Sequence, residues 1–340
     1  MTFAALIRSH RRAARMTLRD LADASGVSAR AISDMERGHS TVPQRRTLDA
    51  LAAALALDPS QRHALIDAAR SSRSHRPYAP PRAVPDFTGR AAELAVLVSA
   101  GAPVLIHGQP GVGKTALAVH AASLVPGPVH FHDLRNPLPA VPDGQLLILD
   151  NASSVHSLPP LPPRVWITSR RALSGLPGVT RLPLPPLPPA DSVTLLTAIT
   201  GTPDPAAVQV ADYCAHLPLA LRIAGNRVAG RPGWTMSHLA QRLTDETRRL
   251  SALTAGDLSL EATLAQAFGA LSPRARDLCR AAAQLPIFDA VAAAELTGWT
   301  LPRVAGAIAE LLDHNLIHPA ANRYRHYALI RLYAMITSGS

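Results

Sequence analysis

The sequence is poor in lysine, cysteine, aromatic residues and long apolar runs. Only Lys114 among its 34 basic residues is a lysine, and the aromatic residues make up 4% of the 340 positions. Cys214 and Cys279 lie far apart and form no C-x-x-C motif, which argues against a zinc module or a disulfide framework. No stretch approaches the roughly 18–20 apolar residues of a membrane-spanning helix, and no apolar segment follows the basic N-terminus. We therefore expect a soluble, cytoplasmic protein without membrane association.

Arginine, alanine and proline are abundant instead. The hydrophobic fraction of 47% predicts a folded chain, and a length of 340 residues predicts about two to three domains. Residues 1–82 contain 14 arginines and 7 acidic residues, so most of the net charge of +10 lies in the first quarter of the chain. A basic excess in one small domain is typical of nucleic-acid binding, although a generally arginine-rich composition would produce part of it.

The first 70 residues predict a helical domain. Helices are expected over 3–14, 18–24, 29–37, 45–55 and 60–70. Thr17 and Ser28 are suitable N-caps, and Gly26 and Gly38 lie where helices should end. The apolar spacing between 21 and 35 buries one face of two helices around a glycine-containing turn. This is the pattern of a helix-turn-helix, whose second helix enters the major groove of DNA.

This segment resembles the helix-turn-helix of the phage-repressor-like (xenobiotic-response-element) regulators. The resemblance is carried by S-x-R-x-I-S at 28–33 and E-R-G at 36–38, while Leu18 departs from a glutamine that often contacts DNA in that family. It implies binding to double-stranded DNA through base and phosphate contacts. The expected contact residues are Ser28, Arg30, Ser33, Arg37, Arg45 and Arg46. A helical module for dimerisation or partner docking is the alternative.

An apolar run at 104–107 leads directly into GQPGVGKT at 108–115, which a helical pattern follows. This strand–loop–helix context is the one that a G-x-x-x-x-G-K-[ST] phosphate-binding loop requires. Its glycines let backbone N–H groups surround phosphate oxygens, Lys114 brings a positive charge to the β- and γ-phosphates, and Thr115 offers a hydroxyl to Mg²⁺. The motif predicts that ADP or ATP binds with Mg²⁺. The expected loop residues are Gly108, Gly111, Val112, Gly113, Lys114, Thr115 and Ala116.

Two further strand ends carry candidate catalytic residues. LLILD at 146–150 ends in Asp150, which with Thr115 is the expected metal site and would hold Mg²⁺ through water. The next residue is Asn151, whose amide cannot act as the base that activates water, so we expect slow hydrolysis at most. VWIT at 165–168 leads to Arg170, whose guanidinium could reach the γ-phosphate. A lone arginine after a strand is more often a surface residue.

The order of these motifs resembles the NB-ARC branch of the signal-transduction NTPases, specifically its actinobacterial regulators. The matching segments are FTGR at 87–90, LDNA at 149–152, TSR at 168–170, CAHLPLALRIAG at 214–225 and YRHYALIRLYA at 324–334. The resemblance implies that Phe87, Gly89 and Arg90 lie against the nucleoside. It also implies that Pro218 packs near the adenine and that His326 contacts the β-phosphate of ADP.

The chain departs from this family's pattern in two ways. Arg325 and Tyr327 replace the methionine and aspartate of the winged-helix motif. The segment 133–144 has barely the dozen residues that a crossover between two parallel strands needs, so the helix normally found there is expected to be missing or reduced to coil. The family usually continues into helical sensor repeats, which we do not expect here, and a separate sensor protein or ligand is one of the partners considered.

We therefore expect a multidomain protein that combines a helical DNA-binding head with an α/β P-loop core. The expected parts are a helix-turn-helix domain at 1–70, a linker at 71–86, a P-loop domain with a parallel sheet at 87–188, a helical subdomain of four short helices at 189–252, and a winged helix at 253–340. The predicted function is an ADP/ATP-switched transcriptional regulator that self-associates on activation. The alternatives are an ATPase of a defence or signalling assembly whose N-terminal helices dock partners, and a degenerate relative that binds nucleotide constitutively.

Overall fold

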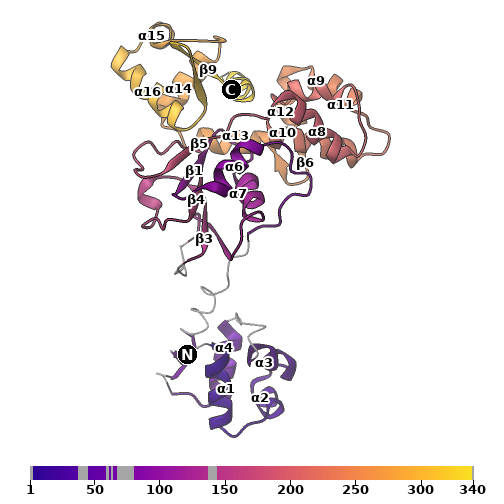
Figure 1. The fold of residues 1–340 in the computed structure, drawn as a ribbon, viewed down its shortest axis with the longest axis vertical. Coiled ribbons are helices and arrows are strands. Elements are labelled where there is room, and N and C mark those ends of the chain that lie inside the picture. Colours follow the sequence, from indigo (N-terminus) through magenta and orange to yellow (C-terminus); the bar gives the residue numbers. More distant parts are fainter. Residues whose placement is uncertain are drawn as a thin grey trace. The chain divides into compact units, whose positions relative to one another are not determined.

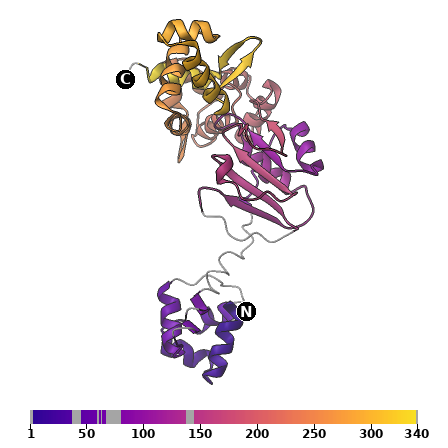
Figure 2. The same ribbon diagram turned by 90° about the vertical axis from the view of Figure 1, so that its left-hand side faces the viewer.

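The computed structural model describes residues 3–36, 45–58, 61–62, 64–66, 80–136 and 144–338. These residues divide into two compact units, the first within 3–66 and the second within 80–338 (Figures 1 and 2). In the described part of the chain, none of the helices combines the length and the hydropathy that a membrane span requires.

The first unit is helical and confirms the first four expected helices to within one residue at each end. They are α1 (Phe3–Ala13), α2 (Leu18–Ser25), α3 (Ala29–Glu36) and α4 (Arg45–Ala54). Thr17 caps α2 by accepting from the backbone N–H of Asp20, and Gly26 ends that helix at a φ of +68°. Ser28 accepts from the N–H of Ala31 at the start of α3. Gly38, most of the linker and part of the fifth expected helix lie outside the described residues.

A small apolar core and one buried ion pair hold this unit together. The buried side chains are Ile7, Leu21, Ile32, Met35, Leu48, Leu51, Leu55 and Leu65. Glu36, at the end of α3, is buried, and its carboxylate accepts two hydrogen bonds from Arg11 of α1, at 2.6 and 2.9 Å. The glutamate of the E-R-G motif is therefore a structural residue that fixes α3 against α1.

The second unit is built around a five-stranded parallel sheet, as the alternating strand and helix patterns predict. Its strands are β1 (Val104–His107), β2 (Val129–Asp133), β3 (Leu146–Ala152), β4 (Val165–Ser169) and β5 (Thr180–Pro183). Their order is β2-β3-β4-β1-β5, and every neighbouring pair is parallel. The central strands read as apolar runs because the sheet buries them. Part of the short connection between β2 and β3 lies outside the described residues.

Helices pack beside the sheet, and further helices follow it in the chain (Figure 1). Helix α6 (Ala91–Ser99) lies beside α7 (Lys114–Ala122), and a short 3₁₀ turn, η1 (Val155–Ser157), follows β3. The helical lobe, residues 189–252, contains α8 (Pro189–Thr200), α9 (Ala207–Tyr213), α10 (Pro218–Ala229), α11 (Met236–Leu243) and α12 (Glu246–Ala252). The expectation of four helices was wrong, because Asp245 caps the N–H of Thr247 and begins a fifth helix.

The C-terminal lobe, residues 253–338, is mainly helical and carries two short hairpins. Its elements are β6 (Thr254–Ala255), β7 (Leu258–Ser259), α13 (Leu260–Gly269), α14 (Pro273–Ala282), α15 (Ala290–Thr297), α16 (Leu301–Asp313), β8 (Ile317–Ala320), β9 (Arg323–His326) and α17 (Ala328–Ile336). Strands β8 and β9 pair antiparallel. Cys214 of the helical lobe and Cys279 of this lobe are both buried and unpaired with any other cysteine.

Candidate functional site

The loop between β1 and α7 takes a path that depends on its glycines. Gly108, Gly111 and Gly113 have φ angles of +156°, +81° and +94°. A Cβ at Gly108 would lie 2.6 Å from the carbonyl oxygen of Leu184, so no larger residue fits there. Gly113 is the N-cap of α7, and the first N–H groups of this helix have no partner within it. The loop therefore presents backbone donors to an anion.

Lys114 is buried beneath this loop. Its Nζ donates to the carbonyl oxygens of Gly108 at 2.8 Å and Gln109 at 3.0 Å. Burial, and then repulsion from Arg170, lowers the pKa of Lys114 to about 7, while Asp150 acts in the opposite direction. A buried ammonium bonded to two neutral carbonyls is suited to receive a phosphate, which would stabilise its charge.

Asp150 is the centre of a hydroxyl–carboxylate cluster at the carboxyl edge of the sheet. Thr115 of α7 and Thr168 of β4 each donate to its Oδ1 at 2.6 Å. The carboxylate is buried at 5% exposure. Carboxylate and hydroxyl oxygens are ligands that Mg²⁺ prefers, so Thr115 and Asp150 fit the metal site that the sequence predicts.

Asn151 and Asp133 extend this cluster toward the edge of the sheet. The side-chain nitrogen of Asn151 donates to Asp150 Oδ2 at 2.8 Å and to Asp133 Oδ1 at 3.2 Å. Asp133 ends β2 directly opposite Asp150 in the sheet register. Hydrogen bonds from Arg135 hold the pKa of Asp133 down at about 2. Sequence reasoning missed Asp133, because its strand contains His130 and His132 and only the sheet order brings it beside Asp150.

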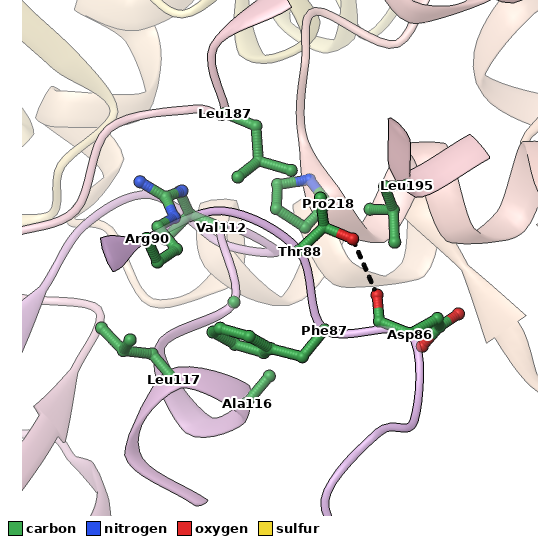
Figure 3. Close-up of a pocket in the computed structure, with 11 residues that line it drawn as sticks. Asp86, Phe87, Thr88, Arg90, Val112, Ala116, Leu117, Leu187, Leu195 and Pro218 are labelled. Atoms are coloured by element: carbon green, nitrogen blue, oxygen red, sulfur yellow. Dashed lines mark hydrogen bonds between the residues drawn. The ribbon is translucent and has the colours of Figure 1, made fainter. Parts of the chain in front are cut away.

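An apolar pocket opens beside the loop (Figure 3). It is lined by Asp86, Phe87, Thr88, Arg90, Val112, Gly113, Ala116, Leu117, Leu187, Leu195 and Pro218. The structure therefore brings together six residues expected to bind nucleotide, namely Phe87, Arg90, Val112, Gly113, Ala116 and Pro218. The ring of Phe87 stacks on that of His120 at 4.0 Å between centroids. A narrow pocket with aromatic and aliphatic walls suits a flat heterocyclic base.

The helical lobe contributes to this pocket and is fixed against the loop. The N–H of Leu219, in the first turn of α10, donates to the carbonyl of Gly111 at 3.1 Å. Arg222 of the same helix binds both carboxylate oxygens of Asp86 at 2.7 and 2.9 Å. Gly89 has a φ of +69° and packs against Asp191, and it is not among the residues that line the pocket.

A second cavity, here the arginine cavity, lies on the Asn151 side of the loop. It is lined by Pro110, Arg135, Asn151, Ala152, Ser153, Arg170, Arg171, Gln266, Ala267, Ala270 and His314. Arg170 donates to Gln266 of α13 at 2.9 Å, and burial followed by the charge of Arg135 lowers its pKa. Arg170 therefore lies in a cavity that also touches the loop, which is compatible with an approach to a terminal phosphate.

The C-terminal lobe contacts the carboxyl ends of β1 and β4. Asn315 pairs its side-chain oxygen with His107 at 3.1 Å, and its nitrogen donates to the carbonyl of Arg170 at 2.9 Å. Arg171 and Asp313 form an ion pair at 2.6 Å. Sequence reasoning did not identify these contacts, because no motif marks Asp313 or Asn315.

His326 lies apart from the apolar pocket that Figure 3 shows. It lines a third cavity that also includes Gln109 of the loop, His216 and Tyr327. Burial, and then Arg331, lowers the pKa of His326 to about 4, so its imidazole is neutral at pH 7. The structure thus places His326 near the loop without bringing it into the pocket that Phe87 and Pro218 form.

Three of the residues expected to contact DNA have side chains in the described part of the first unit. Ser28 and Arg30 are exposed at the start of α3, and Ser33 is half-buried one turn later. Arg37 lies outside the described residues, and the side chains of Arg45 and Arg46 at the start of α4 do as well.

Comparison with known proteins agrees with this architecture. Residues 2–65 match a family of helix-turn-helix domains. Over 324 residues the chain is 32% identical to the regulatory protein AfsR of Streptomyces griseus, covering 76% of this chain and 33% of that protein. The AfsR protein of Streptomyces coelicolor is 32% identical over 326 residues, with the same coverage. The chain spans about a third of the length of these relatives.

A solved structure supports the fold of the second unit. A Walker-type ATPase of Pyrococcus abyssi matches with a TM-score of 0.50 and 14% identity, covering 78% of this chain and 99% of that one. At this identity the likeness concerns the fold alone. The chain thus joins a helix-turn-helix domain to a P-loop ATPase fold, and its sequence is similar to actinobacterial regulatory proteins.

Proposed function

We propose that the chain is a DNA-binding regulator of transcription, of the NB-ARC type, whose second unit binds ADP or ATP with Mg²⁺ as a switch. The observation that carries this proposal is the joint presence, in one chain, of a helix-turn-helix domain and a buried Lys114 beside the Thr115–Asp150–Thr168 cluster. Neither feature alone would indicate regulation, whereas together they connect a nucleotide site to a DNA-binding head.

Each part of a nucleotide has a matching set of residues in the second unit. The base would occupy the pocket between Phe87 and Pro218. The phosphates would bind the loop between β1 and α7, residues 108–113, here the phosphate loop, above Lys114. Thr115 and Asp150 would hold Mg²⁺, which neutralises phosphate charge when it is bound. The cavity shared by Gln109 and His326 supports the further proposal that the C-terminal lobe is a winged helix that closes over the phosphates.

Switching requires that ADP and ATP have different affinities for two shapes of the protein. Three parts of the second unit meet around the site, because α10 contacts the loop at Gly111 while Asn315 contacts Arg170. We propose that ADP favours this closed arrangement, and that exchange for ATP opens it and promotes self-association. Paired heads would then bind DNA more tightly than single ones.

The first test identifies the nucleotide that co-purifies with the full chain and measures binding to duplexes selected from a random pool. We expect bound ADP, and salt-sensitive, sequence-dependent binding that Arg30→Ala weakens by about 10–100-fold. Arg12→Ala, which removes an exposed arginine of α1, is the matched control. Duplex binding without sequence preference, or preference unchanged by Arg30→Ala, would contradict DNA regulation and favour the alternative of a partner-docking ATPase.

A further inference from the structure

The side-chain amide of Asn151 is held in a single orientation by two carboxylates. Its nitrogen lies 2.8 Å from Asp150 Oδ2 and 3.2 Å from Asp133 Oδ1. Ionised carboxylates only accept hydrogen bonds, so the NH₂ group must face them. Both donors of the amide are thereby used, and the oxygen is the polar atom that remains.

The backbone of Asn151 is fixed as firmly as its side chain. Its N–H donates to Thr168 Oγ1 at 3.1 Å, and its φ is +63°, a left-handed conformation that asparagine tolerates better than most residues. Asn151 lines the arginine cavity together with Pro110 of the phosphate loop and Arg170. The amide oxygen is therefore available to a cavity that adjoins the loop.

We propose that Asn151 is a catalytic residue that orients the attacking water during ATP hydrolysis, and that Asp133 is the positioning residue that holds its amide. This rests on the proposed binding of ATP and Mg²⁺. The amide oxygen accepts one proton of a water molecule and directs its oxygen toward the γ-phosphorus. A glutamine performs the same positioning task in other P-loop NTPases.

The step is a simple hydrolysis. A bond forms between the water oxygen and the γ-phosphorus, and the bond from that phosphorus to the β,γ-bridging oxygen breaks, with its electron pair leaving on ADP. The proton lost by water ends on inorganic phosphate. An amide cannot take this proton, so Asn151 contributes orientation and no base catalysis. The site is thus built for slow turnover that limits the lifetime of the ATP state.

The test compares hydrolysis with binding in the full-length chain. Single-turnover hydrolysis of γ-labelled ATP with Mg²⁺ is measured with protein in excess, and ATP affinity is measured by equilibrium titration. Asn151→Ala is expected to slow hydrolysis by about 100-fold while ATP affinity stays unchanged, because orientation and not binding is lost. Ser153→Ala, which lines the same cavity two residues away, is the matched control and should hydrolyse ATP at the wild-type rate.

Two substitutions of Asp133 separate positioning from charge. Asp133→Ala removes the acceptor for Asn151 and is expected to slow hydrolysis by about tenfold, as when the partner that orients an active-site group is lost. Asp133→Asn keeps an acceptor oxygen but removes the charge that binds Arg135, and it should restore a rate close to that of the wild type. If Asp133→Asn were as slow as Asp133→Ala, the role of Asp133 would be to hold Arg135, and its positioning role would be wrong.

The outcomes distinguish this inference from the proposed nucleotide site. If the wild-type chain bound no ATP, the proposed function and the inference would both fail. If it bound ATP but Asn151→Ala hydrolysed it at the wild-type rate, or if the wild type itself did not hydrolyse it, only the inference would be overturned. Thermal unfolding of each variant checks that a lost rate reflects the site and not the fold.

Discussion

Lys114 shows how much one residue type can indicate when it is rare. Every other basic residue of the chain is an arginine, yet the position beneath the phosphate loop carries a lysine. Its Nζ reaches two carbonyls of the loop, at Gly108 and Gln109, from a buried side chain. A guanidinium is planar and wider than an ammonium, so it does not fit between these carbonyls.

We therefore predict that Lys114→Arg weakens nucleotide binding although the charge is kept. The expected loss is about 10–100-fold in affinity, the range for a lost hydrogen bond to a charged group, and it should equal that of Lys114→Ala. Titration with a fluorescent ADP analogue measures it. An arginine variant with wild-type affinity would show that charge alone is sufficient at this position.

His326 leads to a prediction about acid stability. Its pKa falls from about 6.5 in the unfolded chain to about 4 in the folded one because of burial. The unfolded state therefore binds more protons between these values, so this residue lowers stability as the pH falls from 6.5 toward 4. Nearby Arg331 and His318 act in the same direction.

His326→Leu should remove this dependence. Relative to the variant, the wild type is expected to lose about 2–3 kcal/mol of unfolding free energy between pH 7 and pH 4.5. Urea unfolding of both proteins at the two pH values measures the difference. The comparison cancels the contributions of other titrating groups, and an equal loss in both proteins would show that His326 is accessible to protons in the folded state.

At the scale of elements, the site depends on how the phosphate loop meets the first turn of α10. Gly111 has a φ of +81°, and a Cβ added there would lie 3.0 Å from the Cβ of Leu219. The same glycine accepts the backbone hydrogen bond from Leu219. A side chain at this position would therefore push α10 away from the loop.

Gly111→Ala tests this contact, with Gly178→Ala as its control. Gly178 also has a positive φ, of +70°, but nothing lies within 4 Å of a Cβ there. The control should cost about 1–2 kcal/mol of unfolding free energy from backbone strain alone. Gly111→Ala should lower the free energy of unfolding by about 1–3 kcal/mol more than Gly178→Ala does, because its methyl group crowds Leu219. It should also weaken ADP binding. If denaturant unfolding gave the same loss of unfolding free energy for both variants, Leu219 would be able to move away from the added methyl group without destabilising the fold.

Elements with strong local signals were predictable, and those defined by three-dimensional pairing were not. The runs VLIH, LLILD and VWIT read as buried strands because parallel sheets cover both faces. The boundary before α12 was missed because a single Asp245 cap determines it. Leu187 and Leu195 were missed as pocket residues, since only the packing of the helical lobe brings them to Phe87. Asp133 required the sheet order, which places β2 next to β3.

At the scale of the whole molecule, the proposed function requires that nucleotide exchange in the second unit alters DNA binding by the first. The two units are separately compact, and each has its own apolar core. Coupling through oligomerisation needs no fixed contact between them, because bringing two heads together raises their effective concentration on DNA. The account therefore predicts that nucleotide state changes assembly before it changes the head itself.

The affinity of the full chain for its selected duplex, measured with ADP and with a non-hydrolysable ATP analogue, tests this central claim most directly. The account predicts about 5–150-fold tighter binding in the ATP-like state, the usual range of coupling between two sites, accompanied by a larger assembly in sedimentation. Lys114→Ala should abolish the difference. Equal affinity and equal mass in the two nucleotide states would contradict the switch.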